Sequence, residues 1–220
     1  NTSTCNSNVV VEDNIVPTAL CNNLTLYLNG AGAASITVSD VDNGSSDACG
    51  LASQTLTQTN FTCSDLGTTA QVYTFVDVTG NSNTCNFLLQ TIDSINPTAA
   101  CQNITAYLGG SGNVTVTASD VGGNSSDNCS LASNVLSNGS FTCQDVGPNT
   151  VTITVTDQSS NTSSCTSTVT VEDSTSPNMI CNNITLQLNA SGTALLTTAA
   201  IDGGSSDNCG ISSLQLSQAN

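Results

Sequence analysis

Apolar and polar residues alternate along several short stretches of this chain. The clearest case is residues 151–156, where Val, Ile and Val alternate with three threonines. The same alternation marks residues 24–28, 36–38 and 169–171. A period of two residues is typical of a strand with one buried face. Gly-Ser, Asn-Gly and Gly-Asn pairs separate these stretches and favour turns, and no useful length of amphipathic helical period occurs. The pattern predicts an all-β chain.

The sequence repeats itself every 80 residues. Its 220 residues hold 2.75 such units, and we expect them to belong to a longer array. Each unit is predicted to fold as an Ig-like β-sandwich in an extended array, joined by short acidic linkers that end in proline and favour a stiff junction. We expect residues 1–13 to be the last strand of a preceding repeat, 14–93 and 94–173 to be two full repeats, and 174–220 to be a partial one. The positions that recur at this step are Cys5/Cys85/Cys165, Cys21/Cys101/Cys181, Cys49/Cys129/Cys209, Cys63/Cys143, Pro17/Pro97/Pro177 and Asp47/Asp127/Asp207.

Eleven cysteines are heavy usage for a cytosolic protein and typical of a secreted one. The four in each complete repeat allow three pairings. The first and last strands of an Ig-like sandwich run parallel, which favours bonds between the cysteines that open them. Zinc is disfavoured because close cysteine pairs and histidine are absent. We predict the disulfides Cys21–Cys85, Cys49–Cys63, Cys101–Cys165 and Cys129–Cys143, with the partners of Cys5, Cys181 and Cys209 outside residues 1–220.

The chain has 16 acidic residues and no Lys, Arg or His. A nucleic-acid binder needs a basic footprint, and an anionic membrane surface would repel this chain. Without histidine no Ser-His-Asp or Cys-His catalytic arrangement exists. No apolar run is long enough to span a bilayer as a helix. The composition therefore predicts no enzyme activity, no nucleic-acid partner and no membrane insertion.

The acids gather in three sets in each repeat: a loop after the second strand, a turn before the last strand, and the linker. In a sandwich these three segments meet at one pole. Carboxylates that converge without a basic partner suit a hard cation with oxygen ligands, and we predict Ca²⁺ at the junctions. The alternative is that these acids are solvated turn residues, because Asp favours turns. The predicted ligands are Glu12, Asp13, Asp40, Asp42, Asp47, Asp77, Asp93, Asp120, Asp127, Asp157, Glu172, Asp173, Asp202 and Asp207.

Aromatic residues are rare and recur in register. Tyr27 and Tyr107 occupy matching strand positions, and we interpret them as packing residues rather than as a sugar-binding platform. Phe61 and Phe141 are predicted to be core residues. Asn-x-Ser/Thr sequons, for example at Asn23, would permit glycosylation.

An ordered set of motifs recurs in these repeats. Pro-x-x-x-Cys-x-Asn-Ile/Leu-Thr opens each unit, followed by Ser-Asp-x-Cys, Phe-Thr-Cys-x-Asp-x-Gly, Val-Thr-Asp-x-x-x-Asn and Cys-x-x-x-Val-x-Val-Glu-Asp. The set resembles the hyalin-repeat (HYR) class of Ig-like modules, and is similar to tandem repeats of giant extracellular adhesins of Bacteroidota. The resemblance implies a secreted or cell-surface module for adhesion or a stalk, with no catalytic residue.

The sequence as a whole predicts a structural extracellular fibre or adhesin stalk of disulfide-stapled repeats made rigid by Ca²⁺. The expected partners are further copies of the repeat in a longer chain or fibre, and surface glycans or proteins are candidate ligands. Two other functions stay open: a carbohydrate-binding module array, and a non-catalytic segment of a large secreted enzyme.

Overall fold

The computed structural model describes residues 1–217, and it divides by its contacts into two units. Unit 1 comprises Asn1–Pro97, Asp127–Leu131 and Asp157–Asn161, and unit 2 comprises Thr98–Ser126, Ala132–Thr156 and the residues from Thr162 onward. These contact units do not test the predicted repeat boundaries, which stay a prediction. The last three residues of the predicted partial repeat, 218–220, lie outside the described part of the chain.

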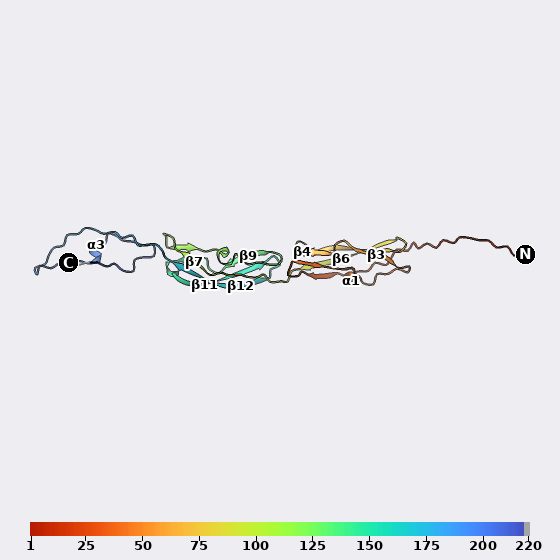
Figure 1. Cartoon of the computed structure of the whole chain (residues 1–220), viewed down its shortest axis with the longest axis horizontal. Coiled ribbons are helices and arrows are strands. Elements are labelled where there is room, and N and C mark those ends of the chain that lie inside the picture. The colour runs from red at the N-terminus through yellow and green to blue at the C-terminus, as the bar shows by residue number, and fades with distance from the viewer. Residues whose placement is uncertain (218–220) are drawn as a thin grey trace. The chain divides into compact units, whose positions relative to one another are not determined.

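Unit 1 contains two sheets (Figure 1). The larger has the order β1-β6-β5-β3, and the smaller pairs β2 with β4. β1 runs parallel to β6, while every other pair is antiparallel. The first and last strands of the repeat are therefore parallel neighbours. The strands are β1 (Leu24–Tyr27), β2 (Ala33–Ser35), β3 (Leu51–Leu56), β4 (Asn60–Thr62), β5 (Gly67–Asp77) and β6 (Ser82–Ile92).

The core of unit 1 lies between these sheets. Alternate residues of β5 and β6 point inward, so that Tyr73, Phe75, Phe87 and Leu89 are buried while their neighbours are exposed or half-buried. Phe61 of β4 packs in the same cluster. The alternation predicted from the sequence is thus the alternation of a strand with one buried face.

Unit 2 has the same topology, with sheets β7-β12-β11-β9 and β8-β10. Val151, Ile153 and Val155 of β11 are buried, as are Val169 and Val171 of β12. The chain is all-β and built of Ig-like β-sandwich repeats, as the sequence predicts. The strands are β7 (Ile104–Tyr107), β8 (Asn113–Thr115), β9 (Leu131–Leu136), β10 (Ser140–Thr142), β11 (Gly147–Asp157) and β12 (Thr162–Glu172).

The expected strand over residues 36–38 is wrong in detail. β2 ends at Ser35, and a single helical turn, α1 (Val38–Val41), follows it. Thr37 explains the turn, because its backbone N–H and its hydroxyl both donate to Asp40 Oδ2, at 2.6 and 2.7 Å. In such a capping contact, an acid in the first turn accepts from the residue that precedes the helix. The other short helices are α2 (Ala118–Gly122), α3 (Thr198–Ile201), η1 (Cys63–Asp65) and η2 (Cys143–Asp145).

Residues 174–217 form only part of a sandwich. They contain α3 and the isolated bridges Asn178↔Ser206 and Cys181↔Asp202, which repeat contacts of the first copy such as Thr18↔Ser46. Residues 184–187, the counterparts of β1, pair with no strand among the described residues. This follows from the sheet order, because the neighbour of β1 is β6, whose counterpart is not among residues 174–217.

Candidate cation site in unit 1

Four disulfides are formed. Two join the predicted partners, Cys21–Cys85 and Cys101–Cys165, each with a Cα–Cα distance of 6.0 Å. The predicted pairs Cys49–Cys63 and Cys129–Cys143 are wrong, and so is the expectation that Cys209 has its partner outside residues 1–220. The other two disulfides join each repeat to the next, Cys63–Cys129 in unit 1 and Cys143–Cys209 in unit 2.

Strand β5 explains the wrong pairing. Cys49 lies two residues before Leu51, the first residue of β3, which pairs with Asp77 at the end of β5. Cys63 lies just before the opposite end of β5, at Gly67. With 11 residues in β5, the two ends are about 30 Å apart, far beyond the reach of a disulfide. Three cysteines, all exposed, form no disulfide within the described residues: Cys5, Cys49 and Cys181.

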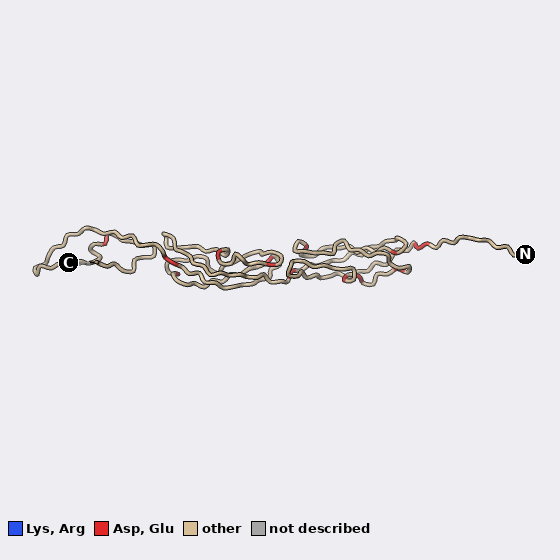
Figure 2. Tube along the Cα trace, viewed as in Figure 1, with Lys and Arg blue, Asp and Glu red and all other residues tan. Residues whose placement is uncertain are grey.

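The acids lie at strand ends, in linkers, and in the short helical turns and loops, and no basic residue lies among them (Figure 2). One oxygen each of Asp93, Asp127 and Asp157 lie within 4.8 Å of one another. Asp93 is in the linker after β6, Asp127 in the loop before β9, and Asp157 at the end of β11. The structure therefore brings a linker acid, a loop acid and a turn acid together, and we define these three as the acidic trio.

Two residues of the trio are buried and Asp127 is half-buried. Asp93 is 3% exposed and Asp157 1% exposed. Asp93 Oδ1 accepts hydrogen bonds from Ile95 N–H and the side-chain amide of Asn128, both at 3.1 Å. Asp93 Oδ2 is also buried but has no hydrogen-bond donor, and Asp127 Oδ1 is in the same state. Buried polar atoms without partners are rare, and they indicate a missing ligand or strain.

Neighbouring asparagines donate hydrogen bonds to some of the carboxylate oxygens of the trio. Asp157 accepts from the backbone and the side-chain amide of Asn161, each at 2.8 Å. The Asn161 amide also donates to the carbonyls of Asp93 and Ile95, at 3.2 and 3.3 Å. Sequence reasoning did not assign Asn128 to the site. It recurs as Asn208 in the third copy but is Ala48 in the first, so this asparagine is periodic in only two of the three copies.

A second group of three residues lies at the start of unit 1. Asp13, Asp47 and Cys49 each place one ligand atom within 4.8 Å of the others. Asp77, the counterpart of Asp157, is not in this group. Its carboxylate accepts hydrogen bonds from Thr79 and Asn81 of its own turn. Hydrogen bonds to Asp13 and the charge of that carboxylate raise the pKa of the Cys49 thiol. Cys49 was not predicted here.

Several other predicted ligands have local structural roles instead. Asp120 repeats the capping contact of Asp40, accepting from the N–H and hydroxyl of Thr117 at 2.7 and 2.6 Å. Asp42 and Asp202 each accept from a serine N–H three residues later. The carboxylates of Asp40, Asp42 and Asp47 therefore do not come together in one cation site. Glu12 and Glu172 are exposed and lie outside both groups.

The last predicted pair, Asp173 and Asp207, lies in unit 2 and shares the surroundings of Asp93 and Asp127. Asn208 donates to Asp173 Oδ1 at 3.1 Å, as Asn128 does to Asp93. Asp207 Oδ2 is buried without a donor. The counterpart of Asp157 in this copy would follow residue 220, so the pair has no third carboxylate within the 220 residues.

The residues of the trio fit a hard divalent cation. Like charges at this distance repel each other, and a buried anion without a counter-charge is strongly destabilising. Since the chain has no Lys, Arg or His, only protons, a bound cation or the chain's own amino terminus could supply positive charge. Carboxylate oxygens are the ligands that Ca²⁺ prefers, and Asp93 Oδ2 and Asp127 Oδ1 are free to accept one.

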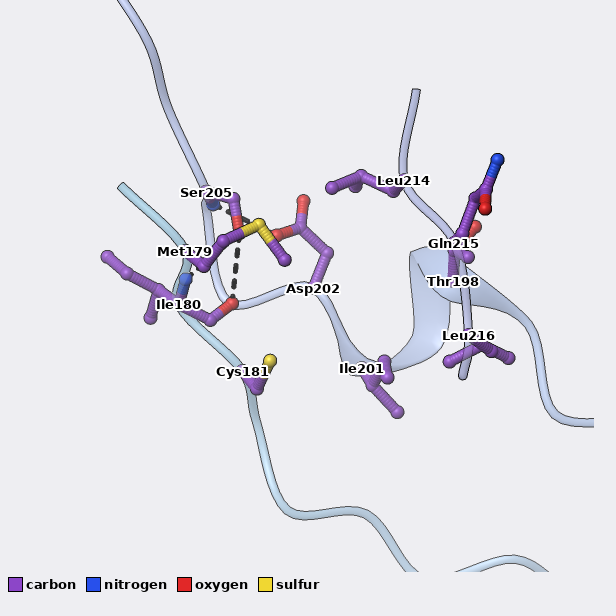
Figure 3. Close-up of a pocket in the computed structure, with 10 residues that line it drawn as sticks. All are labelled: Met179, Ile180, Cys181, Thr198, Ile201, Asp202, Ser205, Leu214, Gln215 and Leu216. Atoms are coloured by element: carbon purple, nitrogen blue, oxygen red, sulfur yellow. Dashed lines mark hydrogen bonds between the residues drawn. The ribbon is translucent and has the colours of Figure 1, made fainter. Parts of the chain in front are cut away.

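A pocket in residues 174–217 offers no comparable chemistry (Figure 3). Met179, Ile201, Leu214 and Leu216 line it, and Ser205 exchanges hydrogen bonds with the backbone of Ile180. Val41, the counterpart of Ile201, is fully buried in the core cluster of unit 1. The pocket thus lies where a residue of the core stands in unit 1.

The aromatic residues divide into two kinds. Phe61 and Phe141 are each 1% exposed, so the prediction that they are core residues is confirmed. Tyr27 and Tyr107 are 60% and 57% exposed, so their interpretation as packing residues is wrong. They stand at strand positions whose side chains point away from the core. No helix among residues 1–217 is long and apolar enough to cross a membrane.

No family model matches the chain, and no curated protein does. Solved structures that share some likeness are cadherin domains. Protocadherin gamma B7, extracellular cadherin domains 1–4, is 12% identical over 79% of this chain and 55% of that chain, with a TM-score of 0.31. Drosophila N-cadherin EC1–4 is 10% identical, over 72% and 50%, with a TM-score of 0.37. The chain thus spans about half the length of either protein. Likeness this weak shows neither a family nor a function.

Proposed function

We propose that the chain is a structural segment of an extracellular fibre or adhesin stalk, in which disulfide-stapled β-sandwich repeats are made rigid by Ca²⁺. The observation that carries this proposal is the acidic trio, with two buried carboxylates and one half-buried, in a chain without basic side chains. Four disulfides support an oxidising, extracellular location. The resemblance to hyalin-type repeats of surface adhesins agrees with this role.

Each member of the trio has a distinct part in this function. Asp93 belongs to the linker, Asp127 to a loop of the next repeat, and Asp157 to the turn between β11 and β12. Calcium would supply the positive charge that these three carboxylates lack. Because the three segments are separated along the chain, holding all three at one point restricts the linker. Asn161 supports the arrangement by joining Asp157 to the linker backbone.

Thermal unfolding with and without Ca²⁺ tests the proposal. A ligand that binds only the folded state stabilises it by about 2.7 kcal/mol at 100 times its dissociation constant. Extracellular sites often bind at about 10⁻⁴–10⁻³ M, so we expect the melting temperature to rise in millimolar Ca²⁺ and to fall again with EDTA. Monovalent salt at equal ionic strength should give a smaller rise, because screening supplies no ligands.

Matched variants separate binding from general charge effects. Asp127→Asn should abolish most of the Ca²⁺ response while making the metal-free protein no less stable, since it relieves repulsion within the trio. Asp120→Asn removes the same charge from a helix cap 7 residues earlier and should keep the Ca²⁺ response. If Asp127→Asn responds to Ca²⁺ as the unchanged protein does, the proposed site is wrong.

A further inference from the structure

Residues 127–129 join the acidic trio to a disulfide. Asp127 belongs to the trio, Asn128 bonds to Asp93, and Cys129 is bonded to Cys63 of the preceding repeat. We propose that the Cys63–Cys129 disulfide positions Asp127 for cation binding, so that breaking this bond lowers the cation affinity of the trio. This inference rests on the proposed function.

The covalent and polar contacts of this loop are continuous. Cys129 N–H donates to Asp127 Oδ2 at 2.9 Å, which fixes the carboxylate relative to the disulfide and leaves Oδ1 without a donor. The Asn128 side-chain amide donates to Asp93 Oδ1 at 3.1 Å and to the Asn29 carbonyl at 3.3 Å. Displacing Cys129 would therefore shift the orientation of Asp127 and the support of Asp93 together.

The loop of residues 127–129 packs in close contact with the turn that contains Gly32. A Cβ atom on Gly32 would lie 2.6 Å from the Asn128 carbonyl oxygen and 2.6 Å from Cys63 Sγ, and the residue has φ +68°. Only glycine fits both the conformation and the space. The disulfide thus holds two backbone segments in direct contact, and the position of Asp127 depends on that contact.

The same device recurs 80 residues later, in unit 2. Cys143 is bonded to Cys209, Cys209 N–H donates to Asp207 Oδ1 at 2.8 Å, and Asn208 donates to Asp173 and to the Gly109 carbonyl. Gly112 has a similarly close neighbour, because a Cβ atom on it would lie 2.8 Å from the Asn208 carbonyl oxygen. A disulfide placed beside the acids in both units is part of the repeat and not an accident of one loop.

Reduction would act on this coupling directly. A dithiol reductant gives two electrons and two protons to the Cys63–Cys129 bond, yielding two thiols and the cyclic disulfide of the reagent. Reduction removes none of the three carboxylates and only loosens the positions of Asp127 and Asn128, so we expect weaker binding and not complete loss. Two coupled equilibria affect each other by the same factor. If the disulfide strengthens cation binding, a bound cation should make the same disulfide harder to reduce.

The test compares Ca²⁺ dissociation constants, measured by calorimetric titration, of the unchanged chain and of two double variants. Cys63→Ser/Cys129→Ser removes the bond beside the trio, and Cys143→Ser/Cys209→Ser removes its counterpart in unit 2 as the control. We expect the first variant to bind Ca²⁺ at the trio about 5- to 150-fold more weakly, the range typical of coupled sites, and the control to bind there as the unchanged chain does.

The outcomes distinguish the two proposals. If the unchanged chain binds no Ca²⁺, the proposed function fails. If it binds and Cys63→Ser/Cys129→Ser binds equally well, only the present inference fails. Should that variant not fold, Gly32→Ala, which keeps both cysteines but separates the two segments, replaces it, with Gly30→Ala as the control because no atom lies within 4 Å of its Cβ position. Unchanged Ca²⁺ affinity in Gly32→Ala would overturn the inference.

Discussion

Asn81 donates its backbone N–H to Asp77 Oδ1 and its side-chain amide to Asp77 Oδ2, each at 2.8 Å. The same amide donates to the carbonyls of Asp13 and Ile15, at 3.0 and 3.2 Å. Asn81 thereby links the turn after β5 to the linker that precedes the repeat. Asn161 makes the corresponding contacts to Asp157, Asp93 and Ile95. The Asp-x-x-x-Asn spacing is therefore a structural element of each repeat.

Asn81→Ala should destabilise unit 1. It removes donors from Asp77 and from two linker carbonyls, and leaving such groups unpaired costs about 1–3 kcal/mol. Asn86→Ala is the matched control, since Asn86 is an exposed residue of β6. Urea unfolding monitored by circular dichroism measures the difference. Equal stability of the two variants would show that the Asn81 bridge is unimportant.

Acid should weaken the same turn. Burial opposes the charge on Asp77, but hydrogen bonds from Asn81 and Thr79 outweigh it and hold the pKa of the carboxyl below its usual 3.8. A lowered pKa in the folded state contributes stability that is present above 3.8 and is lost as the pH falls through the lowered value. Unfolding free energies measured from about pH 5 to about pH 2 should fall less steeply in Asp77→Asn than in the unchanged chain. Identical slopes would contradict this role.

Tyr73 should lose its proton only at high pH. Burial, with a smaller contribution from the charge of Asp42, raises its pKa to about 12. Its hydroxyl donates to Gln54 Oε1 at 2.9 Å. Because the folded state holds this proton longer, stability should fall as the pH rises from 10 towards 12. A Tyr27→Phe/Tyr107→Phe protein leaves Tyr73 as the only tyrosine, and its phenolate absorbance reports the ionisation. Ionisation near pH 10 in the folded protein would be inconsistent with the buried position.

The core and the surface aromatics should respond very differently to truncation. Phe61→Ala should cost about 3–5 kcal/mol, because it opens a cavity between the two sheets of unit 1. Tyr27→Ala, at an exposed position of β1, should change stability by no more than about 0.5 kcal/mol. Guanidinium unfolding of both variants measures these values. A large loss in Tyr27→Ala would mean that Tyr27 packs after all.

Part of the fold was predictable from local alternation, and part from the expected arrangement of the first and last strands. Alternation over residues 151–156 identified β11, and the parallel first and last strands identified the Cys21–Cys85 bond. The helical turn of α1 was missed because it is one turn long, too short for a helical period to appear. The exposure of Tyr27 was missed because alternation shows which residues share a face but not which of the two faces is buried.

The site was predictable only in outline. The recurrence of Asp93, Asp127 and Asp157 in three segments indicated that carboxylates would meet. The Cys63–Cys129 bond was not predictable, because Cys49 and Cys129 are equivalent in the repeat and only the three-dimensional position of β5 distinguishes them. The capping roles of Asp40 and Asp120 were likewise missed, since an acid three residues after a threonine serves a cap or a cation site equally well.

The central claim is that a divalent cation occupies the acidic trio, and one measurement tests it most directly. Crystals of the disulfide-intact chain grown with Ca²⁺, or with a lanthanide in its place, would give an anomalous difference map that locates every bound ion. We predict a peak with oxygen atoms of Asp93, Asp127 and Asp157 at about 2.3–2.6 Å for Ca²⁺. A map with no peak at these three carboxylates, at Ca²⁺ concentrations that raise the melting temperature, would contradict the account.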